Sequence, residues 1–392
     1  MLTTKEEALI KQHINADIRR LALSLKSEEG IRKEVVLQQI AGRQTMRLKV
    51  PSWAAVDNII YPKHLSMEQC SSETTARYKA SLVGSGELLV DMTGGFGVDF
   101  IFMAQAFRHG IYVEVSDELC DIARHNFKAL RSGETTIVCG NGVQYMDSLN
   151  TKADIIYIDP ARRNKDGGKT VRIADCTPDL TAIEEMLVSK SNKVIAKLSP
   201  MLDINDALSR LSHVNEVHIV STDNECKELL FVMSSAPTSS VSIVAVNITN
   251  GTTQRFVCQH DDEGNTSCRY TDTLCRYLYE PNSSIMKSGA FKCVAAHFDI
   301  AKLNPNSHLY TNDILIDNFP GRRFEIIHQF GFSKNELSVL KEYKQANIAV
   351  RNFPLRPDEL KKKLKLKDGG EIYIFATTLN NGNHVLAVCK KV

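Results

Sequence analysis

The chain has 392 residues, two to three times the usual size of a single domain, so we expect two or three domains. Hydrophobic residues make up 43% of it and charged residues 24%, which excludes a disordered chain, a fibrous repeat and a small disulfide scaffold. No stretch approaches the about 18 consecutive apolar residues of a membrane-spanning helix, and the first residues lack the apolar core of a signal peptide. We therefore expect a cytoplasmic protein.

Charge is nearly balanced overall, at +2, but is unevenly distributed. Residues 1–50 carry +4 and residues 351–392 carry +5, so the segment between them carries −7. Basic ends around an acidic middle fit a polyanion that is held by flanking elements, although solvated helix faces explain the same charges.

The first part of the chain, residues 1–84, is predicted to be a helical domain. Thr4 with Glu7, and Ser66 with Gln69, have the spacing of capping boxes that begin helices. This domain contains no catalytic motif.

From residue 85 the apolar pattern changes to short runs that alternate with amphipathic stretches such as 117–131 and 179–190. The alternation predicts an α/β fold with a doubly wound, mostly parallel sheet over residues 85–236. The predicted strands are 88–91, 111–115, 136–139, 155–159, 194–198, 217–221 and 229–233.

The last two of these strands are separated only by the turn-rich residues 222–225, which is too short for a crossover, so they should pair antiparallel. A mostly parallel sheet that ends in an antiparallel hairpin is the order found in Rossmann-like class I methyltransferases.

Residues 236–240 mark a domain boundary because they combine proline with small polar residues. We expect a mixed α+β region over residues 237–320, with a strand at 241–248. A compact α+β module follows over residues 321–392. Its predicted elements are a strand ending at 328, a helix over 334–343, a strand over 347–351, a helix over 357–365, and strands over 372–378 and 385–389.

The ten cysteines are scattered from Cys70 to Cys389, and no two of them show Cys-x-x-Cys spacing. In a chain without an export signal we expect free thiols and no metal site.

A glycine-rich loop over residues 92–97 follows a strand that ends in Asp91. Glycines let a backbone approach a ligand closely, and dinucleotide sites use such loops too. Here Phe100 stands where the third glycine of a dinucleotide motif would be. Asp91 would repel a pyrophosphate but attract the ammonium or sulfonium of S-adenosylmethionine. No Gly-Lys-Ser/Thr follows, which excludes a nucleoside-triphosphate loop.

The ends of the next two strands add candidate contacts. Glu114 lies 23 residues after Asp91, where an acid can accept hydrogen bonds from both ribose hydroxyls. Asn141 is placed to contact the adenine amino group, or to cap a helix.

The turn Asp159-Pro160-Ala161-Arg162 lies at the carboxyl end of the fourth predicted strand, the edge where ligands bind in open α/β sheets. Amino-methylating enzymes carry Asp/Asn-Pro-Pro-aromatic here, in which oxygen atoms accept hydrogen bonds from the acceptor amine. Arg162 can stack on a base or bind a phosphate, or form an ion pair within the domain. Uracil C5-methylating enzymes have similar turns, but they need a cysteine after the fifth strand, where this chain reads Ala-Lys-Leu-Ser-Pro at 196–200.

Together these motifs resemble the class I S-adenosylmethionine-dependent methyltransferases with a THUMP-like C-terminal domain, found in Bacteroidetes-type bacteria. The resemblance covers nearly the whole chain and implies the fold and the cofactor. The motifs that carry it lie at 74–79, 91–99, 159–163, 197–200, 320–324, 352–357 and 367–370.

These considerations give three sets of candidate site residues. The catalytic candidates are Asp159, Pro160, Ala161 and Arg162. The cofactor-binding candidates are Asp91, Thr93, Gly94, Gly95, Phe96, Gly97, Asp99, Glu114, Val115, Asn141 and Gly142. The substrate-binding candidates are Lys79, Arg163, Lys197, Arg322, Arg323, Lys361 and Lys362, beside an expected substrate loop over residues 164–169.

The leading hypothesis is a methyltransferase that uses S-adenosyl-L-methionine to modify an amino nitrogen of an RNA base, with RNA as partner and no membrane or metal involved. RNA is inferred by analogy with true THUMP domains. The alternatives are a methyltransferase for a protein or small molecule, a non-catalytic RNA-binding protein that retains the fold, and an NAD-dependent oxidoreductase. The sequence does not indicate the oligomeric state.

Overall fold

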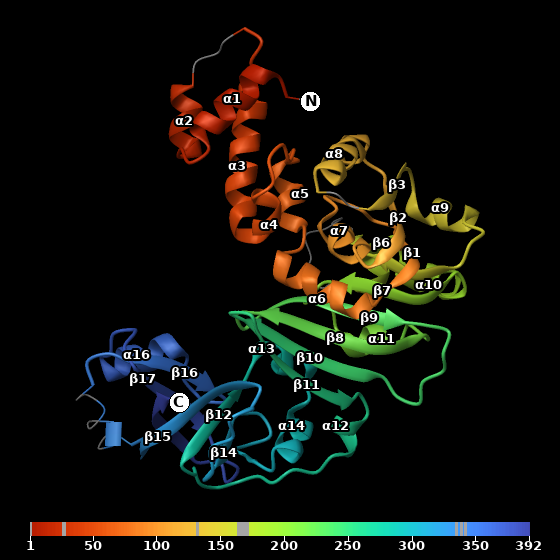
Figure 1. Ribbon diagram of the computed structural model, residues 1–392. Coiled ribbons are helices and arrows are strands. Elements are labelled where there is room, and N and C mark those ends of the chain that lie inside the picture. The colour runs from red at the N-terminus through yellow and green to blue at the C-terminus, as the bar shows by residue number, and fades with distance from the viewer. Residues whose placement is uncertain are drawn as a thin grey trace. The chain divides into compact units, whose positions relative to one another are not determined.

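The computed structural model describes residues 2–25, 29–130, 133–162, 172–333, 336–337, 340 and 343–392 (Figure 1). The chain divides into two compact units. The first contains residues 1–215 and 230–237, and the second contains residues 216–229 and 238–392.

The first unit begins with helices, as the sequence predicts. Two of the expected caps are wrong, however: Thr3, not Thr4, caps the first helix together with Glu6, and Ser72 caps the helix that leads into the sheet. The helices are α1 (Thr4–His13), α2 (Ile18–Ser24), α3 (Lys33–Lys49), α4 (Pro51–Ala54), α5 (His64–Gln69) and α6 (Glu73–Val83).

A parallel sheet follows, in the strand order β7-β4-β1-β2-β3. The seven strands predicted from residue 88 onward are confirmed within a few residues at each end. The five parallel strands are β1 (Gly86–Asp91), β2 (Phe107–Glu114), β3 (Glu134–Cys139), β4 (Ala153–Ile158) and β7 (Ser191–Leu198). The helices between and after them are α7 (Val98–Ala104), α8 (Asp117–Ala129), α9 (Gly142–Ser148), α10 (Leu180–Ser189) and α11 (Ile204–Leu208). Two short strands, β5 (Ala161–Arg162) and β6 (Cys176–Thr177), pair antiparallel, and the 3-10 helix η1 (Ile173–Asp175) directly precedes β6.

The predicted hairpin is present. Strands β8 (Val214–Thr222) and β9 (Glu225–Met233) are neighbours joined by Asp223 and Asn224, whose φ angles are +50° and +63°. Asp and Asn adopt positive φ more readily than other side chains, which suits a two-residue turn.

In the second unit, β10 (Ser242–Thr249) pairs parallel with β8 and antiparallel with β11 (Thr252–Gln259). A seven-stranded sheet follows in the order β13-β14-β12-β15-β18-β17-β16. Its strands are β12 (Tyr277–Pro281), β13 (Ala301–Lys302), β14 (Tyr310–Asn312), β15 (Gly321–Gly331), β16 (Asn347–Arg351), β17 (Ile372–Thr378) and β18 (His384–Lys391), with helices α12 (Asp262–Asn265), α13 (Ser283–Ser288), α14 (Phe291–His297) and α16 (Pro357–Leu364). The helix predicted over 334–343 lies partly outside the described residues.

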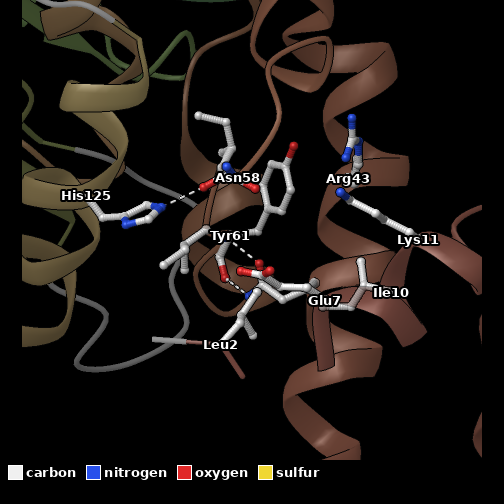
Figure 2. A pocket seen from close by; sticks show the side chains of 11 residues that line it. Leu2, Glu7, Ile10, Lys11, Arg43, Asn58, Tyr61 and His125 are labelled. Carbon is white, nitrogen blue, oxygen red and sulfur yellow. Dashed lines mark hydrogen bonds between the residues drawn. The ribbon is translucent and has the colours of Figure 1, made fainter. Parts of the chain in front are cut away.

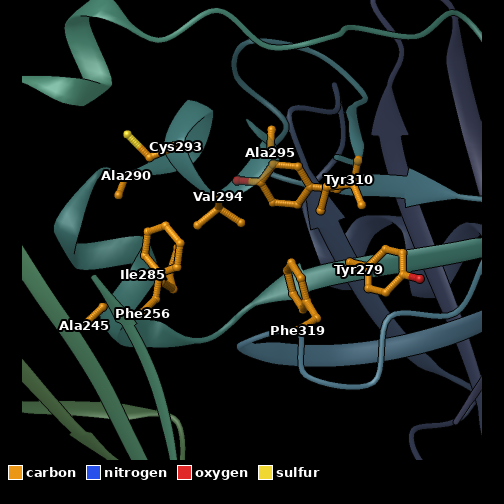
Figure 3. Close-up of a cluster of buried hydrophobic side chains, with 11 residues drawn as sticks. Ala245, Phe256, Tyr279, Ile285, Ala290, Cys293, Val294, Ala295, Tyr310 and Phe319 are labelled. Carbon is orange, nitrogen blue, oxygen red and sulfur yellow. The ribbon is translucent and has the colours of Figure 1, made fainter. Parts of the chain in front are cut away.

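Aromatic side chains dominate one of the cores of the second unit (Figure 3). Tyr279, Tyr310 and Phe319 pack with ring centroids 5.1–6.0 Å apart, and each is almost fully buried. The buried tyrosine hydroxyls have hydrogen-bond partners: Tyr279 donates to the carbonyl of Ile314, and Tyr310 to that of Phe291. This core therefore buries large rings without leaving these polar ends unpaired.

Candidate active site

The glycine-rich loop connects β1 to α7 and is held by backbone hydrogen bonds. The Gly94 N–H donates to the Val113 carbonyl at 2.9 Å, and the Gly97 N–H donates to the Gly94 carbonyl at 2.9 Å. Gly95 and Gly97 have φ angles of +57° and +84°, which side chains rarely adopt. The predicted glycine-rich loop after the strand that ends in Asp91 is confirmed, and it leads into α7.

The two central glycines of this loop have different surroundings. A Cβ on Gly94 would lie 2.1 Å from the buried Tyr112 ring, whereas a Cβ on Gly95 would meet only the Thr93 carbonyl, at 3.7 Å. Gly94 thus allows the loop to pack on the sheet. Gly95 leaves an open backbone surface, which a ligand such as S-adenosylmethionine can approach closely.

This difference predicts two distinct mutant phenotypes. Gly94→Ala should lower the free energy of unfolding by about 2–3 kcal/mol, because the ring cannot move without repacking the core. Gly95→Ala should cost only about 1 kcal/mol of backbone strain but weaken S-adenosylhomocysteine binding about tenfold by covering the open surface. Chemical denaturation and calorimetry measure the two effects. Gly264→Ala is the control, because Gly264 has open space around it and no positive φ. Equal losses of S-adenosylhomocysteine affinity in the Gly94 and Gly95 variants would contradict the interpretation.

Asp91 ends β1 beside this loop and is almost fully buried. Its Oδ1 accepts a hydrogen bond from the Thr93 N–H at 2.9 Å. Burial raises the pKa of Asp91 well above its usual value, and the neighbouring negative charges of Asp99, Asp159 and Glu114 raise it further. Such a buried acid among acids would be stabilised by a cation, and the positively charged groups of S-adenosylmethionine meet this requirement.

Glu114 ends β2, and backbone hydrogen bonds fix both oxygens of its carboxylate. Oε2 accepts from the Gly95 N–H and Oε1 from the Ser116 N–H, each at 2.8 Å. The second acid is therefore attached directly to the glycine loop. Val115, the next residue, is 70% exposed.

Asn141 caps α9, because its Oδ1 accepts from the N–H groups of Val143 and Gln144 at 2.9 and 3.2 Å. Of the two interpretations of Asn141, the structure shows the helix cap. Gly142 allows this helix to approach the loop, since a Cβ there would lie 2.2 Å from the Met92 carbonyl oxygen.

Asp159 follows β4 directly, and two neighbours hold it. Its N–H donates to Thr93 Oγ1 at 2.7 Å, and its carboxylate forms an ion pair with the ammonium of Lys197, which is on β7. The Asp159 side chain is 37% exposed. The acid of the predicted catalytic turn is thus oriented and still accessible.

Lys197 belongs to an alternating row of charges that runs into the interior. Its Nζ lies 3.9 Å from Asp99 Oδ2, and the Nζ of the fully buried Lys79 lies 3.2 Å from Asp99 Oδ1. Tyr157 and Ser71 each donate a hydrogen bond of 2.7 Å to Asp99 Oδ2. Burial alone would raise the pKa of Asp99, but the two lysines and these hydroxyls more than offset it and hold the pKa below its usual value.

This row corrects one sequence expectation. Lys79, a predicted substrate contact, has a side chain that is fully buried beside Asp99 and Ser71 and is inaccessible to a macromolecule. The carboxylate of Asp99, a predicted cofactor contact, binds the surrounding side chains. Tyr157 and Ser71 were not predicted as site residues, because their contacts with Asp99 join segments that are far apart in the sequence.

The remaining substrate candidates lie in other places. Arg322 pairs with the buried Glu280, Arg323 with Asp317, and Lys361 with Asp368. Lys362 is exposed on α16. Arg163, the side chain of Arg162 and the expected substrate loop at 164–169 lie outside the described residues.

None of the helices in the described part of the chain has the length and hydropathy needed to cross a bilayer. Within the same residues, no group of three or more His, Cys, Asp or Glu side chains is arranged to hold a metal ion.

The C-terminal region matches two known families: a ferredoxin-like domain over residues 277–320 and a THUMP-like domain over residues 321–391. The crystal structure of a proposed methyltransferase from Porphyromonas gingivalis W83 is 37% identical, with a TM-score of 0.91 and 100% of both chains covered. The chain belongs to the class I S-adenosylmethionine-dependent methyltransferases with a THUMP-like C-terminal domain. An uncharacterised S-adenosylmethionine-dependent methyltransferase from two strains of Mycobacterium tuberculosis is 23% identical over 331 residues, 83% of this chain and 87% of its own length.

The family assignment confirms the predicted fold class, the enzyme class and the cofactor, and it excludes the NAD-dependent oxidoreductase. This methyltransferase uses S-adenosylmethionine. The observed residues fit that cofactor, because an open glycine backbone lies between a buried acid at the end of β1 and a fixed acid at the end of β2.

Proposed function

We propose that this methyltransferase modifies RNA, at an amino nitrogen of a base. The proposed acceptor site rests on the position of Asp159. Its side chain is 37% exposed at the carboxyl edge of the sheet, and its N–H donates a hydrogen bond to Thr93 of the loop that would hold the cofactor. Asp91, Gly95 and Glu114 would bind S-adenosylmethionine, which supplies an electrophilic methyl group on a sulfonium.

In this proposal Asp159 accepts a hydrogen bond from the acceptor amine, and carbonyl oxygens of the turn 159–161 accept another. These bonds orient the nitrogen lone pair for in-line attack, and such positioning supplies most of the acceleration. The nitrogen loses a proton after transfer, and the Asp159 carboxylate can receive it. Lys197 fixes the rotamer of that carboxylate through the ion pair.

Two features of the second unit support RNA as the substrate. One is the THUMP-like domain itself. The other is α16 and the residues after it, where Leu360 and Leu364 are buried and the exposed side chains are basic: Lys362, Lys363, Lys365 and Lys367. Lys363 also lies over the Phe332 ring, with its Nζ 4.4 Å from the ring centroid. Exposed lysines with a nearby aromatic ring suit a phosphate backbone and its bases.

The direct test is methylation of total RNA with labelled S-adenosylmethionine, with and without ribonuclease. The RNA should come from cells that lack the gene, so that its target sites are unmodified. Label that disappears with ribonuclease supports the proposal, and label that remains on polypeptide would establish the protein-modifying alternative instead. Mass spectrometry of the nucleosides then identifies the modified atom.

A charge reversal on α16 tests the RNA contact separately. Changing Lys362, Lys363 and Lys367 to Glu should weaken RNA binding at least about tenfold and reduce the steepness of its salt dependence by about 0.7 per lost phosphate contact. The matched control reverses three exposed lysines of other regions, Lys5, Lys152 and Lys227. Equal losses in both triple variants would mean that the effect is one of net charge alone.

A further inference from the structure

The first unit contains a cavity of about 170 Å³ that the proposed reaction does not use (Figure 2). It lies between the N-terminal segment with α1, the helix α3, the segment 58–61 and α8. Its lining residues are Leu2, Glu7, Ile10, Lys11, Gln39, Arg43, Asn58, Ile59, Ile60, Tyr61 and His125.

Two residues that line this cavity each contain a buried polar atom with no partner among the described residues. The hydroxyl of Tyr61 is buried without a hydrogen bond, and Tyr61 as a whole is only 3% exposed. The Nε of Arg43 is likewise buried and unpaired. An unpaired buried donor is costly, and most buried polar groups in folded proteins have a partner, so each such group needs an explanation. A ligand with an acceptor group would supply it.

Two further polar residues of the cavity lining, Gln39 and His125, already have partners. Gln39 binds both the N–H and the carbonyl of Tyr61, and the Nε2 of His125 donates to the Asn58 carbonyl at 2.6 Å. These bonds fix the segment 58–61 against α3 on one side and α8 on the other. The bonds of Gln39 and His125 therefore hold this part of the cavity wall in place.

The size and charge of the cavity indicate the class of ligand. An apolar cavity of about 150 Å³ holds one benzene molecule, so about 170 Å³ suits a single ring. Leu2, Ile10, Ile59 and Ile60 supply the apolar surface for that ring. Among the lining side chains, Lys11 and Arg43 outweigh Glu7 by one positive charge, and one terminal nitrogen of Arg43 also pairs with Asp57 at 3.4 Å. Burial raises the pKa of Tyr61 to about 12, so its hydroxyl remains a donor.

We propose that this cavity binds a small aromatic carboxylate, with the ring against the isoleucines and the carboxylate accepting hydrogen bonds from the Tyr61 hydroxyl and the Arg43 guanidinium. The site is separate from the proposed acceptor and does not depend on the identity of the substrate.

The cavity also has a physical connection to the cofactor loop. Phe96 of that loop is buried, and its ring centroid lies 6.4 Å from the Tyr61 ring and 5.1 Å from the Trp53 ring. A ligand that orders Tyr61 would therefore also order the residue between Gly95 and Gly97. Any effect on cofactor affinity must be reciprocal: the ligand changes S-adenosylhomocysteine affinity by the same factor as S-adenosylhomocysteine changes ligand affinity.

The test adds benzoate to the full chain. Calorimetry measures benzoate binding directly, and the rise in melting temperature measures it independently. We expect saturable benzoate binding at millimolar or lower concentration. Toluene, which has the ring without the carboxylate, should bind at least tenfold more weakly. No benzoate binding at 10 mM, or equal binding of toluene, would overturn the proposal.

Two variants locate the site. Tyr61→Phe keeps the ring that packs on Phe96 and removes only the hydroxyl, so it should weaken benzoate binding about tenfold without lowering the melting temperature of the free protein. Ile60→Trp should fill the cavity and abolish binding. Tyr78→Phe, on α6 and outside the cavity lining, is the matched control. Unchanged benzoate affinity in both cavity variants would place the ligand elsewhere and refute the proposal.

Discussion

Replacing Asp159 by alanine is expected to slow methyl transfer about 100- to 1,000-fold and to leave S-adenosylhomocysteine affinity nearly unchanged. The reason is its position. Asp159 lies beside the cofactor loop, and its backbone is linked to that loop by the N–H bond to Thr93 Oγ1, which alanine retains. The lost carboxylate would orient the acceptor nitrogen and not the cofactor.

Single-turnover transfer from labelled S-adenosylmethionine to total RNA measures the rate, and calorimetry measures the affinity. Asp159→Asn is the informative companion, because it retains one acceptor oxygen in the same place and loses the charge that pairs with Lys197. It should keep more activity than alanine. Full activity in Asp159→Ala would mean that the turn after β4 does not bind the acceptor.

Replacing Asp91 by asparagine is expected to weaken S-adenosylmethionine binding about 10- to 100-fold, the usual cost of losing a hydrogen bond to a charged group. The same change should not destabilise the free protein. The pKa of Asp91 is raised by burial and by the surrounding acids, so its ionised form opposes folding at neutral pH. Asparagine keeps an oxygen for the Thr93 N–H without that charge.

The sign of the pH dependence follows from the direction of this shift. An acid whose pKa is higher in the folded state than in the unfolded state lowers stability as the pH rises above its unfolded pKa of about 4, and the loss is complete above its folded pKa. The loss disappears again as the pH falls to about 4. The melting temperatures of the cofactor-free wild-type protein and of Asp91→Asn should thus differ most at neutral pH, where that of the variant is equal or higher. They should converge near pH 4. A less stable asparagine variant at pH 7 would contradict the inferred role of Asp91.

The sheet was predictable because its signals are local: each strand is a short apolar run, and two of them end in the acids Asp91 and Glu114, the first of which is followed by the glycines at 94, 95 and 97. The first helix shows where local signals fail. Thr3 with Glu6 and Thr4 with Glu7 have the same capping-box spacing. Arg32, 26 residues away, binds the carboxylate of Glu6 and so decides between them. No local pattern contains that contact.

The same distinction applies to the candidate site. The glycine loop and the acids at the strand ends follow from local pattern and from the rule that parallel strands end at one edge. The environment of Lys79 does not, because Asp99, Ser71 and Tyr157 come from separate segments and meet it only in the folded chain. A lysine near the sheet was therefore expected to bind substrate, whereas it stabilises a buried carboxylate.

This buried lysine has a consequence for the modularity of the enzyme. The sequence indicates a boundary at residue 84, yet Lys79 and Ser71 lie before it and their partner Asp99 lies after it. A polypeptide truncated to start at Ser85 would retain every glycine and acid of the cofactor loop but would leave Asp99 inside the protein without its principal counter-ion. The helices ahead of the sheet are thus an integral part of the methyltransferase, and neither gene fusion nor domain exchange could replace them without also supplying an equivalent cation.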